Sequence, residues 1–333
     1  MKNLLAILAL SLLAVACQQE KTAQQPEDQS TPLQVLTSAD YQVEYKNLRL
    51  YPIVADQEFI TANQNVGDFL NLAQAMKNSR FRITEKKPYG RSDDHGAVNS
   101  LTIQNKSQDT VFLMTGDVVR GGNQDRVLAM DMVVPPRTIT DIPVFCVEHG
   151  RWTYHEPEEG QSEEAARNRK IFAFTGYYHV ASNDIRKTIR ETGNQQEVWN
   201  KVNELTSIHN AQSSTEAYAA LEESEAFTNT RDAYLEHFRQ RFNDKKGVVG
   251  VVAVSGDKIL GADVFGHPNL FQKQYESLLH SYITDAMSNG KSVDIKAEDL
   301  DRYVNSLQKS FGKSVDSEDH FQYQGKLVHF TNL

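Results

Sequence analysis

The alternation of apolar and polar positions divides the chain into three parts. Between residues 45 and 147, short apolar stretches alternate with polar turns, which is typical of strands with one buried face. The spacing of apolar residues at 66–76 instead predicts a short helix. The first half is therefore predicted to be mainly antiparallel β-structure, with strands near 48–54, 81–84, 97–104, 111–114, 126–134 and 138–147.

The middle and the end of the chain follow a helical pattern. Apolar residues recur every three or four positions at 184–191, 195–208, 228–244, 269–287 and 297–311. Residues 156–168 are acidic and polar and are expected to form a surface loop. The run 248–254 is apolar on both faces, and Ser255-Gly256-Asp257 predicts a turn into a second strand at 258–265. Together these patterns predict an α+β fold: a mainly antiparallel β N-terminal half, a helical middle, and a β-hairpin plus helices at the C-terminal end.

The first residues have the pattern of an export signal. Lys2 precedes an apolar stretch at 4–16, which is shorter than the roughly 20 residues that span a bilayer. Leu13-Ala14-Val15-Ala16-Cys17 resembles the lipobox of bacterial lipoproteins, in which the cysteine is lipidated and becomes the first mature residue. Ala14 stands where leucine is commoner, and the alternative is a secreted protein cut after Ala16.

This pattern predicts the organisation and the location of the chain. We expect a signal peptide at 1–16, a lipidated Cys17 with a flexible polar tether at 17–40, and a single α+β domain at 41–333. We expect the chain to associate with the membrane through this lipid anchor. Gln18, rather than aspartate, follows the cysteine, which favours the outer membrane of the cell envelope; periplasmic and surface-facing placement both stay open.

Composition narrows the possible partners. The chain carries 35 Lys and Arg against 44 Asp and Glu, a net charge of −9, which disfavours nonspecific nucleic-acid binding. It leaves room for a local basic pocket for a small anion. Cys17 and Cys146 are the only cysteines, so lipidation of the first leaves no internal disulfide.

The first candidate motif is Gly-Asp-Val-Val-Arg-Gly-Gly-Asn-Gln-Asp-Arg at 116–126. Its glycines suit a tight turn between strands. In the alternative interpretation, exposed backbone N–H groups of the Gly121-Gly122-Asn123 turn join Arg120 and Arg126 to hold an anion. The segment is neither a P-loop nor a dinucleotide-binding fingerprint.

The second candidate motif is Pro-Val-Phe-Cys-Val-Glu-His-Gly-Arg-Trp at 143–152. Strand parity places Cys146 and His149 on opposite faces, so Cys146 is interpreted as a small buried hydrophobe rather than a nucleophile. One Cys–His pair falls short of the four ligands of structural zinc, and we predict no metal or cofactor. A flat polar ligand could be bound by Glu148, Arg151 and Trp152. Alternatively, Glu148 and Arg151 could form an ion pair beside a packed Trp152.

A third candidate is Asp263. Strand parity puts it on one face with Ile259, Gly261 and Phe265. A carboxylate among such neighbours needs a partner, and an arginine from the two motifs is the expected one. The pair could be structural or part of a site.

These segments resemble the ARG and Rhodanese-Phosphatase-superfamily-associated Protein domain family. The resemblance covers about residues 45–283. It implies no activity or catalytic residue; the family name hints at nucleotide or ADP-ribose metabolism. The positions that match the family patterns are Gly121, Gly122, Gln124, Arg126, Cys146, Val147, Glu148, Gly150, Arg151 and Trp152.

Three functions remain open at this point. The first is a binding module for a small anionic or nucleotide-like ligand. The second is a structural or partner-binding envelope protein. The third is a hydrolase that uses Asp117, Glu148 or Asp263 as acid–base groups. The predicted ligand-binding residues are Arg120, Gly121, Gly122, Gln124, Arg126, Glu148, Arg151, Trp152 and Asp263.

Overall fold

The fold is built on one antiparallel sheet and one barrel, seen in a computed structural model that describes residues 31–86, 99–150, 173–243, 245–312 and 319–333. The apolar run forms β12 (Val248–Ser255), in which all eight residues are buried. It lies between β3 (Leu48–Ala55) and β13 (Lys258–Phe265). The sheet continues outward to β1 (Leu33–Val35) on one side and to β15 (Lys326–Asn332) and β14 (His320–Tyr323) on the other, with β2 (Val43–Tyr45) also paired to β3.

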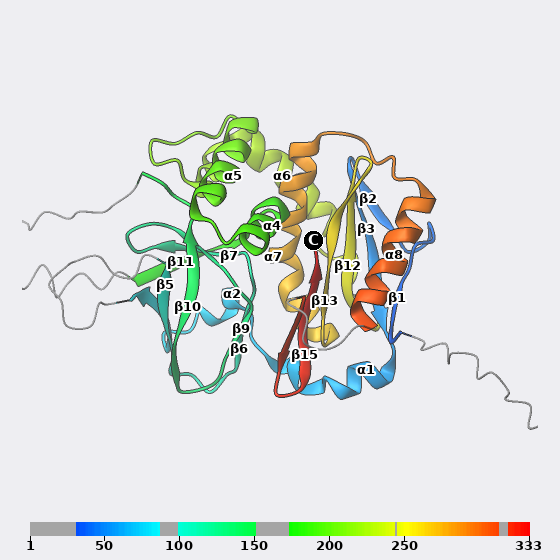
Figure 1. Cartoon of the computed structure of the whole chain (residues 1–333), viewed down its shortest axis with the longest axis horizontal. Coiled ribbons are helices and arrows are strands. Elements are labelled where there is room, and N and C mark those ends of the chain that lie inside the picture. The colour runs from blue at the N-terminus through cyan, green and yellow to red at the C-terminus, as the bar shows by residue number, and fades with distance from the viewer. Residues whose placement is uncertain (1–30, 87–98, 151–172, 244, 313–318) are drawn as a thin grey trace, which may run out of the picture. The chain divides into compact units, whose positions relative to one another are not determined.

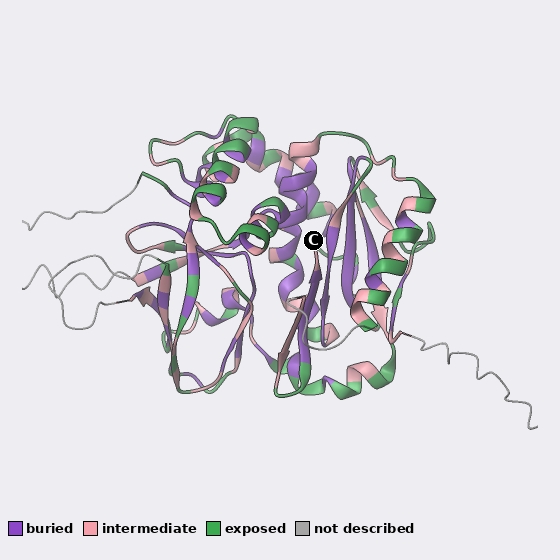
Figure 2. Ribbon diagram, viewed as in Figure 1, coloured by how far each residue is buried: buried purple, intermediate pink, exposed green. Residues whose placement is uncertain are grey.

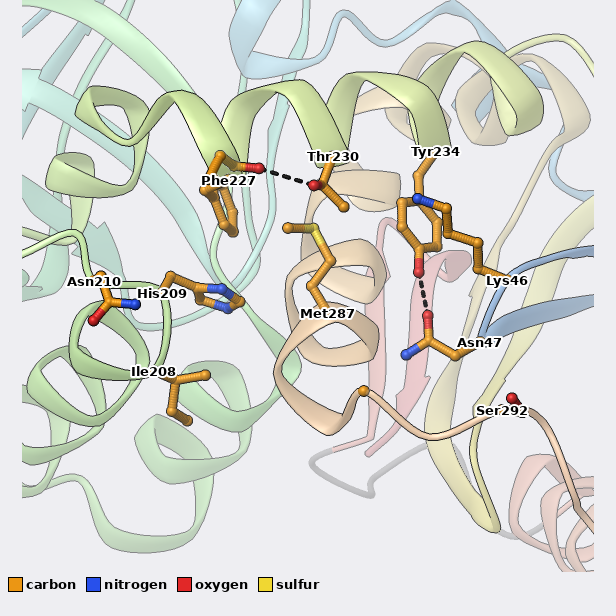
Figure 3. Close-up of a pocket in the computed structure, with 12 residues that line it drawn as sticks. Lys46, Asn47, Ile208, His209, Asn210, Phe227, Thr230, Tyr234, Met287 and Ser292 are labelled. Atoms are coloured by element: carbon orange, nitrogen blue, oxygen red, sulfur yellow. Dashed lines mark hydrogen bonds between the residues drawn. The ribbon is translucent and has the colours of Figure 1, made fainter.

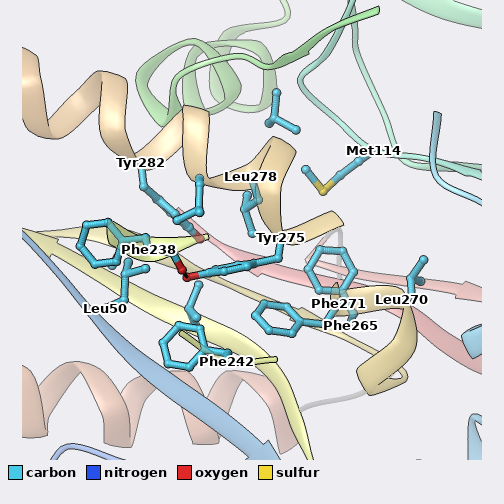
Figure 4. Close-up of a cluster of buried hydrophobic side chains, with 14 of the residues drawn as sticks. Leu50, Met114, Phe238, Phe242, Phe265, Leu270, Phe271, Tyr275, Leu278 and Tyr282 are labelled. Atoms are coloured by element: carbon cyan, nitrogen blue, oxygen red, sulfur yellow. Dashed lines mark hydrogen bonds between the residues drawn. The ribbon is translucent and has the colours of Figure 1, made fainter. Parts of the chain in front are cut away.

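Helices cover both faces of this sheet (Figure 1). On one face, α7 (Pro268–Asn289) packs against β3, β12 and β13 through a large aromatic and aliphatic cluster that includes Phe265 and Tyr275 (Figure 4). On the other face, α8 (Ala297–Gly312) contributes Leu300 and Leu307 to a separate cluster. Figure 2 shows β12 and most of α7 buried, whereas the outer side of α8 is exposed.

The barrel is closed in the order β10-β5-β4-β11-β7-β8. Apolar side chains such as Ile83, Ile103 and Val144 fill its interior. Two further strands, β6 (Val111–Leu113) and β9 (Met132–Val134), pair beside it. The barrel strands are β4 (Phe81–Glu85), β5 (Ser100–Asn105), β7 (Asp117–Gly121), β8 (Arg126–Leu128), β10 (Thr138–Cys146) and β11 (Ala173–Val180).

The middle of the chain supplies helices that pack against the barrel and α7. Ser182, Asn194 and Ser224 cap three of them by accepting hydrogen bonds from first-turn N–H groups, which fixes where each helix begins. These helices are α4 (Asn183–Thr192), α5 (Gln195–Ile208) and α6 (Glu225–Phe238), with the 3-10 segment η2 (Tyr218–Glu223) between the last two.

The α+β class, the helical middle and the central hairpin are confirmed. The predicted helix at 66–76 is wrong as one element, because it is split into η1 (Gln64–Asp68) and α2 (Leu72–Ala75). Between them Leu70 pairs with Val111, and Asn71 caps α2 in a capping box with Gln74. A short helix, α1 (Gln57–Ala62), precedes them.

Two further sequence expectations are corrected. The strand expected at 126–134 is two strands, β8 and β9, because the chain leaves the barrel after Leu128 to pair with β6. Ile259 does not share the face of Asp263 and Phe265. An irregularity in the β12–β13 pairing moves Ile259 to the cluster under α8, whereas Phe265 lies in the cluster under α7.

Some segments were not anticipated from the pattern. Residues 33–35 were expected to belong to the flexible tether, but they form the edge strand β1. Strands β11, β14 and β15 were also not predicted. The loop expected at 156–168 lies outside the described residues. No helix in the described ranges combines the length and apolar character needed to cross a membrane.

Candidate functional site

The β7–β8 hairpin carries the first motif, and its glycines are required by close packing. Gly121 and Gly122 have φ of +125° and +53°, which L side chains adopt with strain. A Cβ at Gly121 would lie 2.8 Å from the carbonyl oxygen of Ala173, and one at Gly122 would lie 2.6 Å from Oε1 of Glu85. Asp125 closes the turn by accepting a hydrogen bond from the Gly121 N–H at 3.0 Å.

Arg126 points into the barrel rather than into a pocket. Its side chain is 1 % exposed, and its Nη2 lies 3.7 Å from Oε1 of Glu85. Its Nη1 donates to Oε1 of Gln124 at 3.2 Å, while Glu85 also accepts the Asn123 N–H at 2.9 Å. The guanidinium therefore fixes the hairpin from inside, as expected of a buried charge that must be paired.

Arg120, Gly121, Asp125 and Glu148 line one pocket of about 470 Å³. Glu148 is buried and accepts the Asp125 N–H at 3.1 Å, which joins the end of the second motif to the first. Arg120 is half exposed, and its Nε lies 3.5 Å from Oδ2 of Asp125. The rest of the lining comes from β11 and from the segment before and within η2, at Thr175, Gly176, Tyr177, Ser213, Thr215, Ala217, Ala219, Ala220 and Glu223.

The charge of this lining differs from that of a simple anion site. Among its described residues, Arg120 is the cation, and Asp125, Glu148 and Glu223 are carboxylates. Gln124 lies outside the lining and donates from Nε2 to the carbonyl oxygen of His149 at 3.2 Å, which holds the two motifs together.

The remaining motif residues have other positions. Cys146 is buried, and burial raises the pKa of its thiol. His149 lies at the surface with its Nδ1 2.9 Å from Glu216 and its ring beside Trp199, so Cys146 and His149 form no dyad. This agrees with the interpretation of Cys146 as a small buried hydrophobe. Cys17, Arg151 and Trp152 lie outside the described residues.

Asp263 belongs to a different part of the molecule and does not line the Arg120 pocket. The expectation that an arginine of the two motifs pairs with it is wrong. Its partner is Arg186 of α4, which binds both carboxylate oxygens at 3.0 and 2.5 Å. The hydroxyl of Tyr282 also donates to it. Burial alone would raise the pKa of Asp263, but Arg186 and His329 outweigh it and hold the pKa well below its usual range.

His329 extends this buried group to Asp131. Its Nε2 lies 3.0 Å from Asp263 and its Nδ1 2.6 Å from Asp131, which also accepts the N–H and hydroxyl of Thr115. Burial alone would lower the pKa of His329, but the two carboxylates outweigh it and raise the pKa to about 9. Neither His329 nor Asp131 carries a local sequence signal. The pairing of β13 with β15 brings His329 close to Asp263, and Asp131 reaches His329 from the segment between β8 and β9.

Asp117 is the remaining candidate acid. It is fully buried and accepts hydrogen bonds from the Met114 N–H and the Tyr177 hydroxyl, both at 2.8 Å. Burial raises its pKa to about 7. The preceding Gly116 packs against Arg186, since a Cβ there would lie 2.6 Å from Arg186 Cγ. The Gly116-Asp117 start of the first motif therefore faces the buried charge group, and not the Arg120 pocket.

Within the described ranges, no group of three or more histidine, cysteine, aspartate or glutamate residues could hold a metal ion.

The fold and the two motifs define an α+β protein in which the β7–β8 hairpin and Glu148, just after β10, line one pocket. The chain belongs to the ARG and Rhodanese-Phosphatase-superfamily-associated Protein domain family, whose model matches residues 37–330. The match includes both motifs and Asp263, and it extends beyond the 45–283 expected from the resemblance. The family's activity is uncharacterised. No curated protein and no solved structure matches the chain.

Proposed function

We propose that the pocket beside the β7–β8 hairpin binds a small polar ligand with an anionic group, as in nucleotides and sugar phosphates. The observation that carries the proposal is that residues of both motifs, Gly121 and Glu148, line one pocket with Arg120. Its volume of about 470 Å³ falls in the range of roughly 300–1,000 Å³ that is usual for small-molecule sites.

The lining narrows the expected ligand. Arg120 supplies guanidinium donors that match a phosphate or carboxylate. The carboxylates of Asp125 and Glu148 are acceptors for hydroxyl groups. A ligand that presents a diol next to its anionic group fits this lining better than a bare phosphate does.

The test is a binding measurement on residues 18–333, which contain every described element. Melting temperature and calorimetric titration would be recorded with ADP-ribose, adenosine monophosphate and ribose 5-phosphate. We expect stabilisation by at least one of them and a loss of affinity of about tenfold or more in Arg120→Gln, since a charge-assisted hydrogen bond contributes roughly 1.5–3 kcal/mol. Arg239→Gln is the control, because both arginine side chains are 49 % exposed and Arg239 pairs with Glu276 on α7. No stabilisation by any of the three would count heavily against the proposal.

A structural or partner-binding role is the second candidate, favoured by the burial of Arg126 with Glu85 inside the barrel. It predicts that Arg126→Met and Glu148→Gln lower the melting temperature, while no ligand of the panel binds the unaltered protein. If Arg120→Gln lost ligand binding while its melting temperature stayed unchanged, a structural or partner-binding role could not be the only function.

We also propose that the chain is a lipoprotein of the cell envelope, anchored through Cys17. The support is the lipobox-like sequence 13–17 after the apolar stretch. Expression in a bacterial host with an alkyne analogue of palmitate should label the protein. Cys17→Ser should abolish the label, and Cys146→Ser should retain it. Equal labelling of both variants would contradict the proposal.

A further inference from the structure

A second pocket, of about 510 Å³, lies away from the Arg120 pocket and shares no lining residue with it. Four parts of the fold enclose it: the ends of α5 and α7, one side of α6, and the turn between β2 and β3. Ile208 and His209 lie on one side, Lys46 and Tyr234 lie on the other, and Met287 stands between them (Figure 3).

One part of this pocket is apolar. Ile208 is a large hydrophobic side chain that is 48 % exposed, and the partly buried Met287 and the buried Phe227 also line the pocket. The ring of His209 packs against Phe227 with a centroid distance of 4.8 Å. Burial lowers the pKa of His209, which favours the neutral form of the ring. These side chains offer an apolar ligand surface without an opposing charge.

The other part presents a cation on a fixed turn. Lys46 has φ of +53°, a left-handed conformation that is unfavourable in a residue with a side chain. Its Nζ lies 5.3 and 5.4 Å from the ring centroids of Tyr45 and Tyr234. Asn47 holds the turn by donating to the carbonyl oxygen of Ala286 and by accepting from the Tyr234 hydroxyl. Within the described part of the chain, Lys46 forms no ion pair.

We propose that this pocket binds a small organic anion with an apolar body. Its carboxylate lies at the Lys46 ammonium group, and its body covers Ile208, Met287 and the edge of Phe227. Lys46 is the one formal charge among the described lining residues. An orientation with the carboxylate at Ile208 is unfavourable because α5 ends there, and helix C-termini carry a partial negative charge.

The test uses octanoate as the anionic probe, on residues 31–333, which form one compact unit that contains every described element. Calorimetric titration at neutral pH should give a dissociation constant below about 1 mM, the affinity expected of a weak one-charge ligand. 1-Octanol, with the same body and no charge, should bind about tenfold more weakly, and octylamine should not compete. No binding of octanoate, or binding of octylamine as tight as that of octanoate, would overturn the proposal.

Three variants locate the site. Lys46→Gln should weaken octanoate binding about tenfold, which is the loss expected for one charge-assisted contact. Lys245→Gln is the matched control, because its Nζ also lies over two rings, those of Tyr41 and Phe242, each at 5.6 Å, but outside the pocket. Ile208→Gln should weaken binding without lowering the melting temperature, since the side chain is half exposed. Equal affinity in Lys46→Gln and Lys245→Gln would overturn the proposal.

Discussion

Arg126 and Cys146 face each other across β8 and β10 at one end of the barrel interior. Arg126 is paired with Glu85, whereas Cys146 is held through its backbone: Gln195 accepts its N–H at 2.7 Å and donates to its carbonyl oxygen at 2.8 Å. The thiol is thus enclosed next to an ion pair. Burial raises its pKa, although the charge of Arg126 acts in the opposite direction.

Cys146 is predicted to be unreactive in the folded protein. In residues 31–333 it is the only cysteine, so the release of thionitrobenzoate from Ellman's reagent reports on this thiol alone. Because the thiolate is the nucleophile and the side chain is buried, the reaction should be roughly 100-fold slower, or more, than in urea-denatured protein. A native rate equal to the denatured rate would contradict the buried placement.

At the residue scale, the sequence predicted the burial of some side chains but not the direction in which others point. The burial of Cys146 followed from its apolar neighbours on a strand of known parity. The inward direction of Arg126 did not, because it depends on Glu85, which comes from β4 and reaches the same barrel interior only after the strands have closed. An arginine at the end of a glycine-containing turn looks the same in the sequence whether it faces a ligand or a carboxylate.

At the scale of elements, glycines set the spacing of the sheet. A Cβ at Gly250 in β12 would lie 2.2 Å from the carbonyl oxygen of Asp263 in β13. A Cβ at Gly266, directly after β13, would lie 1.9 Å from the carbonyl oxygen of Leu327 in β15, while its N–H donates to Val328 at 3.0 Å. Both contacts are with backbone atoms, which cannot rotate away.

Gly266→Ala is predicted to lower the free energy of unfolding by about 1–3 kcal/mol, the usual cost of an added group in a packed site. Urea unfolding followed by circular dichroism would measure it. Gly312→Ala is the control: Gly312 ends α8, and a Cβ there would meet nothing within 4 Å, so the change should be neutral or slightly stabilising. Similar losses in both variants would show that the close approach to Leu327 is not the cause.

Elements with a strong periodic pattern were predicted well, and short ones were not. The helix at 195–208 matches α5 residue for residue. The helix at 66–76 was wrong because Asn71 caps a new helix and because Leu70 pairs with a strand. Strand β1 has only three residues and is defined by its pairing with β3, which the local pattern does not contain.

At the scale of the whole described chain, buried charges connect four separate segments. Arg186 on α4 binds Asp263 on β13, and His329 on β15 bridges Asp263 to Asp131, which lies between β8 and β9. All four side chains are at most 10 % exposed. The group therefore ties the sheet to the barrel, and each charge requires the others because an unpaired buried charge is costly.

This group predicts a loss of stability at alkaline pH. His329 has a pKa of about 9 in the folded protein against 6.5 as the ordinary value, so its stabilisation is full below pH 6.5 and is lost as pH rises through about 9. A shift of this size corresponds to roughly 3 kcal/mol. Asp131 and Asp263, with lowered pKa values, stay ionised in this window. Asp117 also makes the protein less stable as pH rises. Its loss occurs between its ordinary pKa of 3.8 and its folded-state pKa of about 7, mostly below the pH range of the His329 effect.

His329→Gln should be less stable than the unaltered protein at pH 6.5, and the difference should shrink by roughly 2–3 kcal/mol as pH rises past 9. Urea unfolding at several pH values would measure both curves. A difference that is independent of pH would mean that His329 does not change its charge in the folded state.

By itself the sequence determined the α+β class, the central hairpin, the α5 and α7–α8 helices and the two motifs, because each depends on local periodicity or on turn residues. The tertiary structure alone decided which motif residues meet at a pocket. It placed Arg120 and Glu148 together, turned Arg126 inward to Glu85, and gave Asp263 to Arg186 and His329. The physical reason is that a buried charged side chain is oriented by its partner, and the partners of Arg126 and Asp263 come from strands or a helix distant in sequence.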